Sequence, residues 1–215
     1  LRRFCPAARA LPAASEACFS ISEHLARVSG RVARLGAITA GSPAERDAAA
    51  LVARRLTPAW ERIRAATLAS RSAGDPNSAL PESARMISPS DFGFHNALLE
   101  NDGRLRFLDF EYAGWDDPAK TVCDFFCQPD VPVPARFMDD FARLAVPPDQ
   151  ADPLFRARVE LLMPVYRLKW CCIVLNEFVA SDAARRRFAR PGGDSEERKR
   201  GQILKAEAIL AALGA

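Results

Sequence analysis

Three polar side chains in the middle of the chain have types and a spacing that suit chemistry on a phosphate group. Asp91 is followed five positions later by Asn96, and Asp109 lies thirteen positions after Asn96. A carboxylate that accepts a proton, followed by an amide and a second carboxylate that bind a metal ion, is typical of phosphoryl transfer. The pattern predicts Asp91 as the base and Asn96 and Asp109 as ligands of Mg²⁺, which prefers oxygen ligands.

The residues between the two predicted metal ligands favour a β-hairpin. Asp102 and Gly103 lie between two short apolar segments, and Asp-Gly at a hairpin tip favours a two-residue turn, because glycine tolerates positive φ. This turn would place Asn96 directly opposite Asp109, with Cβ atoms about 5 Å apart. A shift of one residue in the register would send one of the two ligands to the other face.

The composition is that of one soluble globular domain with a sizeable core. The net charge of +3 is too small to indicate nucleic-acid binding by itself. No apolar run reaches the roughly 18 residues that a membrane-spanning helix needs. Six cysteines without a Cys-x-x-Cys pair and only two histidines argue against zinc. We therefore predict a cytoplasmic protein with reduced cysteines that binds neither nucleic acid nor membranes.

Apolar residues that recur at three- and four-residue steps predict that most of the chain is α-helical. Ser42-Pro43-Ala44-Glu45 is a helix start signal, while Pro58 and Pro164 predict a kink or break. The fold class expected is mainly α with a small β-hairpin. The predicted helices run from Ser15 to about Leu35, from Pro43 to about Leu68, from Pro118 onward, and over 135–145, 150–179 and 195–213, with a short strand at 85–87.

The segment SPSDFGFHNALLENDGRLRFLDFEYAGWDDPAK, which starts at Ser88, resembles the catalytic core of the aminoglycoside phosphotransferase and choline kinase-like family, relatives of the protein kinases. The resemblance implies a protein-kinase-like fold. In this reading residues 1–215 are a single helical C-terminal lobe, with the catalytic loop and hairpin at 86–111.

The resemblance also implies the roles of single residues. Asp91 would be the base for a hydroxyl of a small-molecule acceptor, and Asn96 and Asp109 would hold Mg²⁺ and the phosphates of ATP or GTP. Pro89 stands where the family has a histidine that supports the loop, so other residues must brace it. His95 either approaches a phosphate of the nucleotide or braces the loop by a hydrogen bond.

Three further residues are candidates for binding the acceptor. Glu111 stands where the family often has an acidic residue, and together with Asp116 and Asp117 it makes the loop after Asp109 acidic, which suits a cationic acceptor. Arg167 either lies along apolar surface with its charged end in water or reaches the substrate cleft and favours an anionic or hydroxylated acceptor. The sign of the acceptor's charge stays open.

Members of this family have an N-terminal lobe with a nucleotide-covering loop and a strand lysine. The residues before Asp91 show no such pattern, and the chain starts at Leu1 rather than Met. We therefore expect a piece of a longer kinase, with that lobe as its partner and little activity alone. The alternative is a catalytically degenerate kinase-like domain that binds or regulates. Pro89 and the missing lobe favour it, whereas the intact Asp91, Asn96 and Asp109 oppose it.

Overall fold

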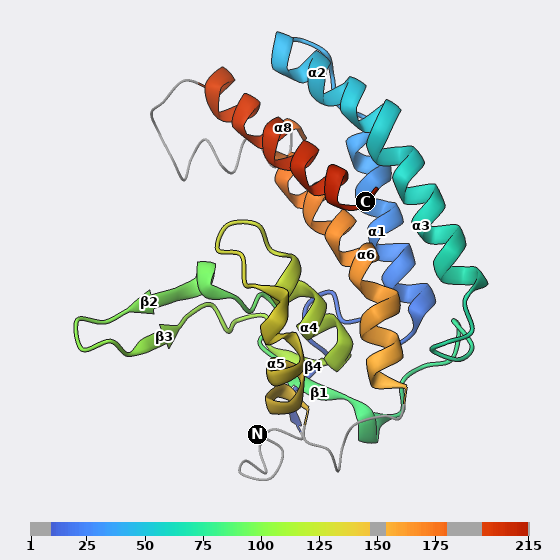
Figure 1. Ribbon diagram of the computed structural model, residues 1–215, viewed down its shortest axis with the longest axis vertical. Coiled ribbons are helices and arrows are strands. Elements are labelled where there is room, and N and C mark those ends of the chain that lie inside the picture. The colour runs from blue at the N-terminus through green and yellow to red at the C-terminus, as the bar shows by residue number, and fades with distance from the viewer. Residues whose placement is uncertain (1–9, 147–153, 180–194, 215) are drawn as a thin grey trace. The chain divides into compact units, whose positions relative to one another are not determined.

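The computed structural model describes residues 10–146, 154–179 and 195–214, and every structural statement below concerns these residues. They form a mainly α-helical fold with two small antiparallel sheets (Figure 1), which confirms the predicted fold class. The parts of the predicted helix over 150–179 and of the irregular N-terminus that fall at 150–153 and 1–9 lie outside the described residues.

The longer elements follow in chain order, with short 3₁₀ segments at 82–84, 94–96, 135–137 and 176–178. They are α1 (Ile21–Leu35), α2 (Pro43–Leu51), a π-helical turn (Val52–Leu56), α3 (Thr57–Ala69), β1 (Met86–Ser88), β2 (Ala97–Leu99), β3 (Leu105–Phe107), β4 (Gly114–Asp116), α4 (Pro118–Cys127), α5 (Met138–Ala145), α6 (Phe155–Leu175) and α8 (Ser195–Ala212).

The chain divides into two compact units. The first unit contains the described residues of Leu1–His24 and Ser70–Tyr166, and thus all four strands, α4 and α5. The second unit contains the described residues of Leu25–Ala69 and Arg167–Ala215, and thus most of α1 together with α2, α3 and α8. The candidate site residues other than Arg167 all belong to the first unit.

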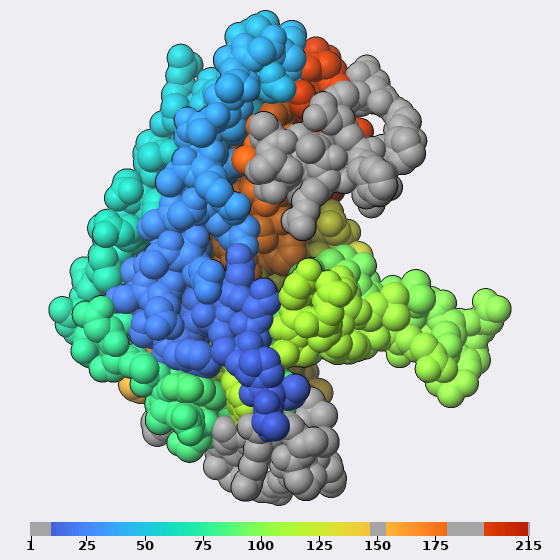
Figure 2. Space-filling view, turned by 180° about the vertical axis from the view of Figure 1, so that it is seen from behind, coloured from blue at the N-terminus to red at the C-terminus, as the bar shows by residue number. Residues whose placement is uncertain are grey.

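The predicted hairpin forms, but its register differs from the prediction by one residue. Leu98 pairs with Arg106 rather than with Phe107. The reason lies in the loop, in which Gly103 donates its N–H to the carbonyl of Glu100 at 2.9 Å and has a φ of +83°. These features make a three-residue loop that ends on a left-handed glycine, a common alternative to the two-residue turn. The hairpin projects from the rest of the first unit (Figure 1, Figure 2).

A second sheet, which the sequence did not predict as a pair, lies at the base of the candidate site. β1 pairs antiparallel with β4, so that Met86 opposes Asp116 and Ser88 opposes Gly114. Ala13 adds a parallel bridge to Trp115, the middle residue of β4. Of these two strands only β1 was predicted, because β4 lies in a segment whose glycine, aspartates and proline favour a turn-rich loop.

α1 and α2 each start at a Ser-x-x-Glu capping box, in which the serine and glutamate side chains bind each other's backbone N–H groups. The predicted start at Ser42 is confirmed, because its hydroxyl accepts from Glu45 N at 3.3 Å and the Glu45 carboxylate accepts from Ser42 N at 2.9 Å. The predicted start at Ser15 is wrong. The same box occurs further along, at Ser20 and Glu23, and the helix begins there.

The two prolines predicted to disturb helices behave differently. Directly before Thr57 and Pro58 the backbone takes a π-helical turn, Val52–Leu56, which agrees with the predicted division. Pro164 does not break α6, which continues to Leu175, so that prediction is wrong. The neighbours of Pro164 in sequence are buried, and we attribute the continuous helix to this packing, which offsets the missing hydrogen bond.

The second unit has a core of helix against helix. α2 and α8 lie side by side, where Lys199 binds Glu45 at 2.8 Å and the Glu196 carboxylate accepts from Ala44 N at 3.3 Å. Cys171 and Cys172 of α6 are fully buried there. Burial raises the pKa of the Cys172 thiol to about 12 and raises that of Cys171 further still. The five described cysteines are free thiols.

Helices that combine enough length and apolar character to cross a bilayer are absent from the described residues.

Candidate active site

The loop that follows β1 presents Asp91 to solvent and holds it by its backbone and its side chain. The Asp91 side chain is half exposed, at 50%. The Asn96 amide group donates to the carbonyl of Asp91 at 2.9 Å, and His95 Nε2 lies 3.1 Å from Asp91 Oδ1. An ionised carboxylate can only accept, so in that state Nε2 carries the proton of this bond. The structure thus brings Asp91, His95 and Asn96 together.

His95 braces the loop, which is one of the two roles predicted for it. A side chain at Gly93 would place its Cβ 2.5 Å from Nδ1 and 2.6 Å from Cε1 of His95, so that any other residue would force the imidazole ring out of its position. The ring is therefore held between this glycine and the Asp91 carboxylate. The other role, contact with a nucleotide phosphate, stays a prediction.

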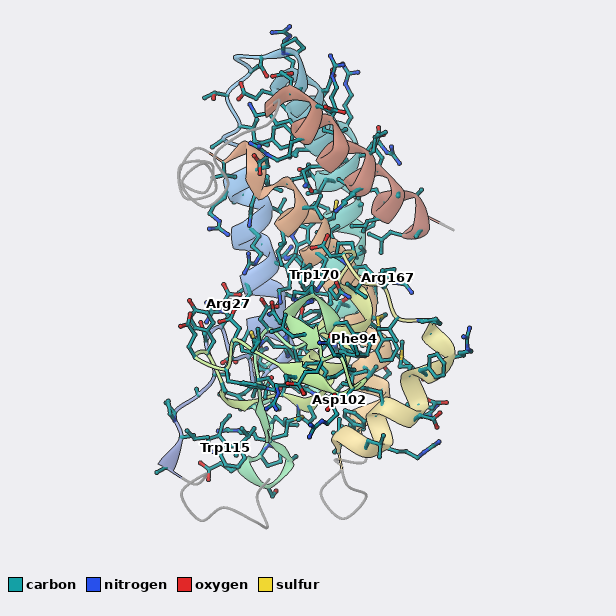
Figure 3. The ribbon with its side chains drawn as sticks, turned by 90° about the vertical axis from the view of Figure 1, so that its left-hand side faces the viewer. Arg27, Phe94, Asp102, Trp115, Arg167 and Trp170 are labelled. Carbon is teal, nitrogen blue, oxygen red and sulfur yellow. The ribbon has the colours of Figure 1, made fainter. Side chains whose placement is uncertain are left out.

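A cluster of phenylalanines packs against the loop and supports it. Phe92 of the loop lies with its ring centroid 4.6 Å from that of Phe107 in β3, and Phe94 (labelled in Figure 3) lies 5.5 Å from Phe125 in α4. Phe125 in turn stacks on Phe141 of α5 at 4.3 Å. These contacts join the loop and the hairpin to the helices of the first unit and keep both in a defined position.

Asp109 follows β3 and is exposed. Its backbone has a φ of +66°, a left-handed conformation that is uncommon for residues other than glycine and clusters at functional sites. The prediction that Asn96 directly opposes Asp109 is wrong, because Leu108 N donates to Asn96 O at 2.9 Å and occupies that position. Since β3 ends at Phe107 and the backbone then turns, strand alternation no longer decides where the Asp109 side chain points.

The donor chemistry of Asn96 and Asp109 nonetheless suits a hard cation. The amide nitrogen of Asn96 is used by Asp91, which leaves its amide oxygen as an acceptor, and the Asp109 carboxylate is exposed. Within the described residues, no three or more His, Cys, Asp or Glu side chains are grouped so as to hold a metal ion. The metal-binding roles of Asn96 and Asp109 stay predictions.

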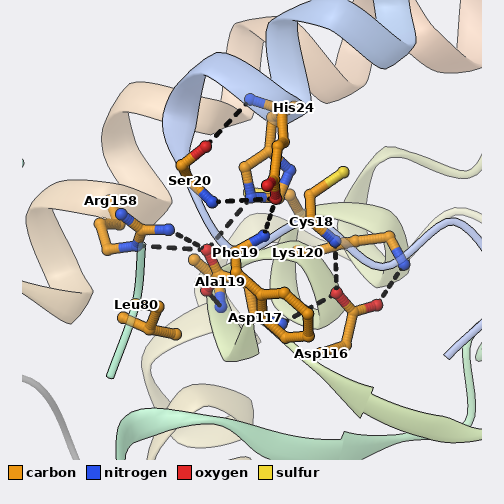
Figure 4. Close-up of polar contacts among 12 residues, drawn as sticks. Cys18, Phe19, Ser20, His24, Leu80, Asp116, Asp117, Ala119, Lys120 and Arg158 are labelled. Atoms are coloured by element: carbon orange, nitrogen blue, oxygen red, sulfur yellow. Dashed lines mark hydrogen bonds and ion pairs between the residues drawn. The ribbon is translucent and has the colours of Figure 1, made fainter. Parts of the chain in front are cut away.

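The acidic loop after Asp109 divides into exposed and buried residues. Glu111 is exposed in a turn, and Arg167 is exposed on α6 in the second unit. Asp116 is buried with 0% exposure; Oδ1 accepts from Cys18 N and Asp117 N, and Oδ2 is paired with Lys120 (Figure 4). Its predicted contact with substrate is therefore replaced by a structural role, whereas those of Glu111 and Arg167 stay predictions.

The buried Asp116–Lys120 pair sits in acidic surroundings. Burial raises the pKa of the Asp116 carboxyl, and Lys120 offsets this only in part. Burial acts to lower the pKa of Lys120, but the charges of Asp116 and Asp124 raise it, and the net change is upward.

Asp117 forms a second buried network, which sequence reasoning did not find. Its Oδ1 accepts from Ala119 N at 2.8 Å and caps α4, while its Oδ2 binds Arg158 and lies 3.1 Å from His24 Nε2 (Figure 4). His24 Nδ1 lies 2.7 Å from the Tyr166 hydroxyl. Burial alone would raise the pKa of Asp117, but His24 and Arg158 lower it below its ordinary value.

Comparison with known proteins supports a fold but no family. No protein-family model and no curated protein matches the chain. A solved structure, that of a choline/ethanolamine kinase family protein from Mesorhizobium loti, is similar, with a TM-score of 0.50 and 19% sequence identity. The chain has a kinase-like fold. The similarity covers 94% of this chain but 60% of that kinase, so the chain spans less than two thirds of its length.

Proposed function

We propose that this chain is the C-terminal, catalytic lobe of a small-molecule kinase that transfers the γ-phosphate of ATP to a hydroxyl group with the help of Mg²⁺. The observation that supports this most is Asp91, an exposed carboxylate held by His95 and Asn96 within a kinase-like fold. The lobe that covers the nucleotide belongs, in this proposal, to the part of the protein beyond this sequence, so the chain alone turns over slowly.

Asp91 acts as the base. The acceptor's hydroxyl oxygen forms a bond to the γ-phosphorus while the bond from that phosphorus to the oxygen bridging to the β-phosphate breaks, and the hydroxyl proton passes to the Asp91 carboxylate. The products are the phosphorylated acceptor and ADP. A positioned base of this kind contributes about 10²–10⁴-fold to the rate. His95 holds Asp91 Oδ1 by a hydrogen bond, so that Oδ2 is the oxygen that accepts the proton of the acceptor.

Asn96 and Asp109 are the residues that would hold Mg²⁺, through the amide oxygen and the carboxylate. The ion supplies neutralisation of the charge that develops on the phosphates. Asn96 also anchors the backbone of Asp91, so that it links the metal site with the base.

Substitution of the two aspartates in the complete protein tests this function. We expect Asp91→Ala to lower kcat by about 10²–10⁴-fold. Mg²⁺–ATP binding should stay unchanged, because of the two substrates the base contacts the acceptor and not the nucleotide. Asp109→Ala should abolish transfer and also weaken Mg²⁺-dependent nucleotide binding. Phosphate transfer to a panel of hydroxyl compounds and calorimetric titration with Mg²⁺–ATP measure both effects.

Asp140→Ala is the matched control, since Asp140 is exposed and pairs with the exposed Arg143. It should leave transfer and binding unchanged. Full turnover in Asp109→Ala would remove the metal assignment, and full turnover in Asp91→Ala would remove the base. Mg²⁺-dependent nucleotide binding by the wild type without transfer to any acceptor would instead indicate a catalytically degenerate binding domain.

A further inference from the structure

The backbone directly before Asp91 is in an unusual conformation that needs support. Ser90 has a φ of +73°, in the left-handed region that residues other than glycine seldom adopt. Such a conformation persists only where the surroundings determine it. Ser90 N donates to the Ser88 hydroxyl at 3.0 Å, and the Ser90 hydroxyl donates to the Ser15 carbonyl at 3.2 Å. Ser88 is buried, and its hydroxyl also accepts from Thr121 at 3.0 Å.

Ser15 belongs to the segment 12–18, which we call the strap. The strap turns at Ser15 and Glu16, where Ala17 N donates to Ala14 O at 3.0 Å. The strap is attached to the loop after Asp109 as well as to Ser90. Its hydrogen bonds to that loop are Ala14 N to Trp115 O at 2.9 Å, Trp115 N to Pro12 O at 2.9 Å, Ser15 N to Tyr112 O at 3.1 Å and Cys18 N to Asp116 Oδ1 at 3.2 Å. Ser15 therefore links the two loops, because its N–H binds one and its carbonyl binds the other.

The position of the strap is tightly defined where it crosses β4. A Cβ at Gly114 would lie 2.6 Å from Ala14 N and 2.7 Å from Ala13 C, and it would also press on Pro12 O. Backbone atoms cannot give way as a flexible side chain can, so glycine is required at this position. Ala14 and Cys18 are buried and anchor the strap on both sides of Ser15.

We propose that the strap positions both catalytic loops, with Ser90 and Gly114 as positioning residues that touch neither acceptor nor metal. This inference rests on the proposed kinase function. Pro89 stands where the kinases that this chain resembles have a histidine that supports the loop. In this chain the hydroxyl groups of Ser88 and Ser90 brace the loop instead. A brace that only stabilised the fold would affect unfolding, whereas a positioning device affects kcat while KM for both substrates stays nearly constant.

The test uses four variants of the complete protein. Ser90→Gly removes the hydroxyl but keeps a residue that accepts the positive φ. Gly114→Ala displaces the strap, and the third variant combines both changes. Gly30→Ala in α1 is the matched control, because a Cβ there meets nothing within 4 Å.

We expect Ser90→Gly and Gly114→Ala each to lower kcat by about 10- to 100-fold, the range that a misplacement of about 1 Å produces. The kcat of the double variant should be no lower than that of the less active single variant, because both changes break the same connection. Gly30→Ala should retain wild-type kcat. Multiplying effects in the double variant, an unchanged kcat in Ser90→Gly, or equal changes in KM and kcat would each overturn the proposal.

If the wild type transfers no phosphate, the kinase function is rejected but the strap is not. Hydrogen–deuterium exchange then tests the strap by itself. Ser90→Gly should then speed exchange in 88–96, and Gly114→Ala should speed it in 88–96 and in 109–116, with Gly30→Ala unchanged. Wild-type exchange in Ser90→Gly overturns the strap, including where Gly114→Ala fails to fold.

Discussion

Asp116 and Asp117 are adjacent and fully buried, yet their pKa values move in opposite directions. Asp116 has one cationic partner, Lys120, and burial dominates, so its pKa is raised. Asp117 lies between His24 and Arg158, and their hydrogen bonds and charges outweigh burial, so its pKa is lowered. Asp117 therefore remains ionised and connects the start of α4 to α1 and α6.

Replacing Asp117 by alanine should destabilise the protein strongly. The change leaves Arg158 and His24 buried without their carboxylate and removes the cap of α4, and loss of one partner of a buried pair costs about 3–5 kcal/mol. Urea unfolding followed by circular dichroism measures it. Asp140→Ala, at an exposed ion pair, should stay within about 0.5 kcal/mol of wild type; a similar small change in Asp117→Ala would contradict this assignment.

The same carboxylate makes stability depend on pH on the acid side. Because folding lowers its pKa, the stabilisation is fully present above the usual value of 3.8 and is lost as the pH falls through the lower folded value. The free-energy difference of unfolding between wild type and Asp117→Asn should thus be constant at neutral pH and shrink below about pH 4. A difference that grows on acidification would reverse the assigned sign.

Individual elements show where sequence reasoning succeeds. The start of α2 could be predicted because Ser42, Pro43 and Glu45 all indicate the same position. The start of α1 could not, because Ser15 and Glu16 lie just before an apolar stripe while the true box is at Ser20 and Glu23. An Asp-Gly pair is compatible with two- and three-residue loops, so it predicted the hairpin without its register.

At the scale of the helix, the capping box of α2 provides a sharp test. Ser42→Ala removes the side-chain acceptor for Glu45 N and should lower the free energy of unfolding by about 1 kcal/mol, while Ser42→Gly should lower it by only a few tenths. Urea titration of both variants measures the difference. Equal losses in the two variants would mean that the hydroxyl is not the reason for the cap.

At the scale of the whole molecule, the kinase-like fold could be predicted from one segment that starts at Ser88, since motif spacing is visible in a sequence. The buried partners of Asp117 could not be, because His24 and Arg158 lie 93 and 41 residues away from it. The strap was equally hidden, since Ser15 and Ser90 are 75 residues apart and neither belongs to an apolar pattern. Contacts of this length depend on the tertiary fold.

The two units also differ in charge. Among the described residues, acidic side chains outnumber basic ones in the first unit, and basic ones outnumber acidic ones in the second. An acidic unit raises the local concentration of cations. This suits the proposed Mg²⁺ site at Asn96 and Asp109, and it agrees with the upward pKa of Lys120.

The rate at which the adjacent thiols of Cys171 and Cys172 are labelled reports how often the second unit opens locally. Alkylating reagents attack the thiolate, and with such high pKa values and no exposure these thiols react only after the helices part. Mass spectrometry after an iodoacetamide pulse should find both unmodified in native protein and fully labelled in urea. Rapid labelling of both in native buffer would show instead that α6 opens on the timescale of seconds.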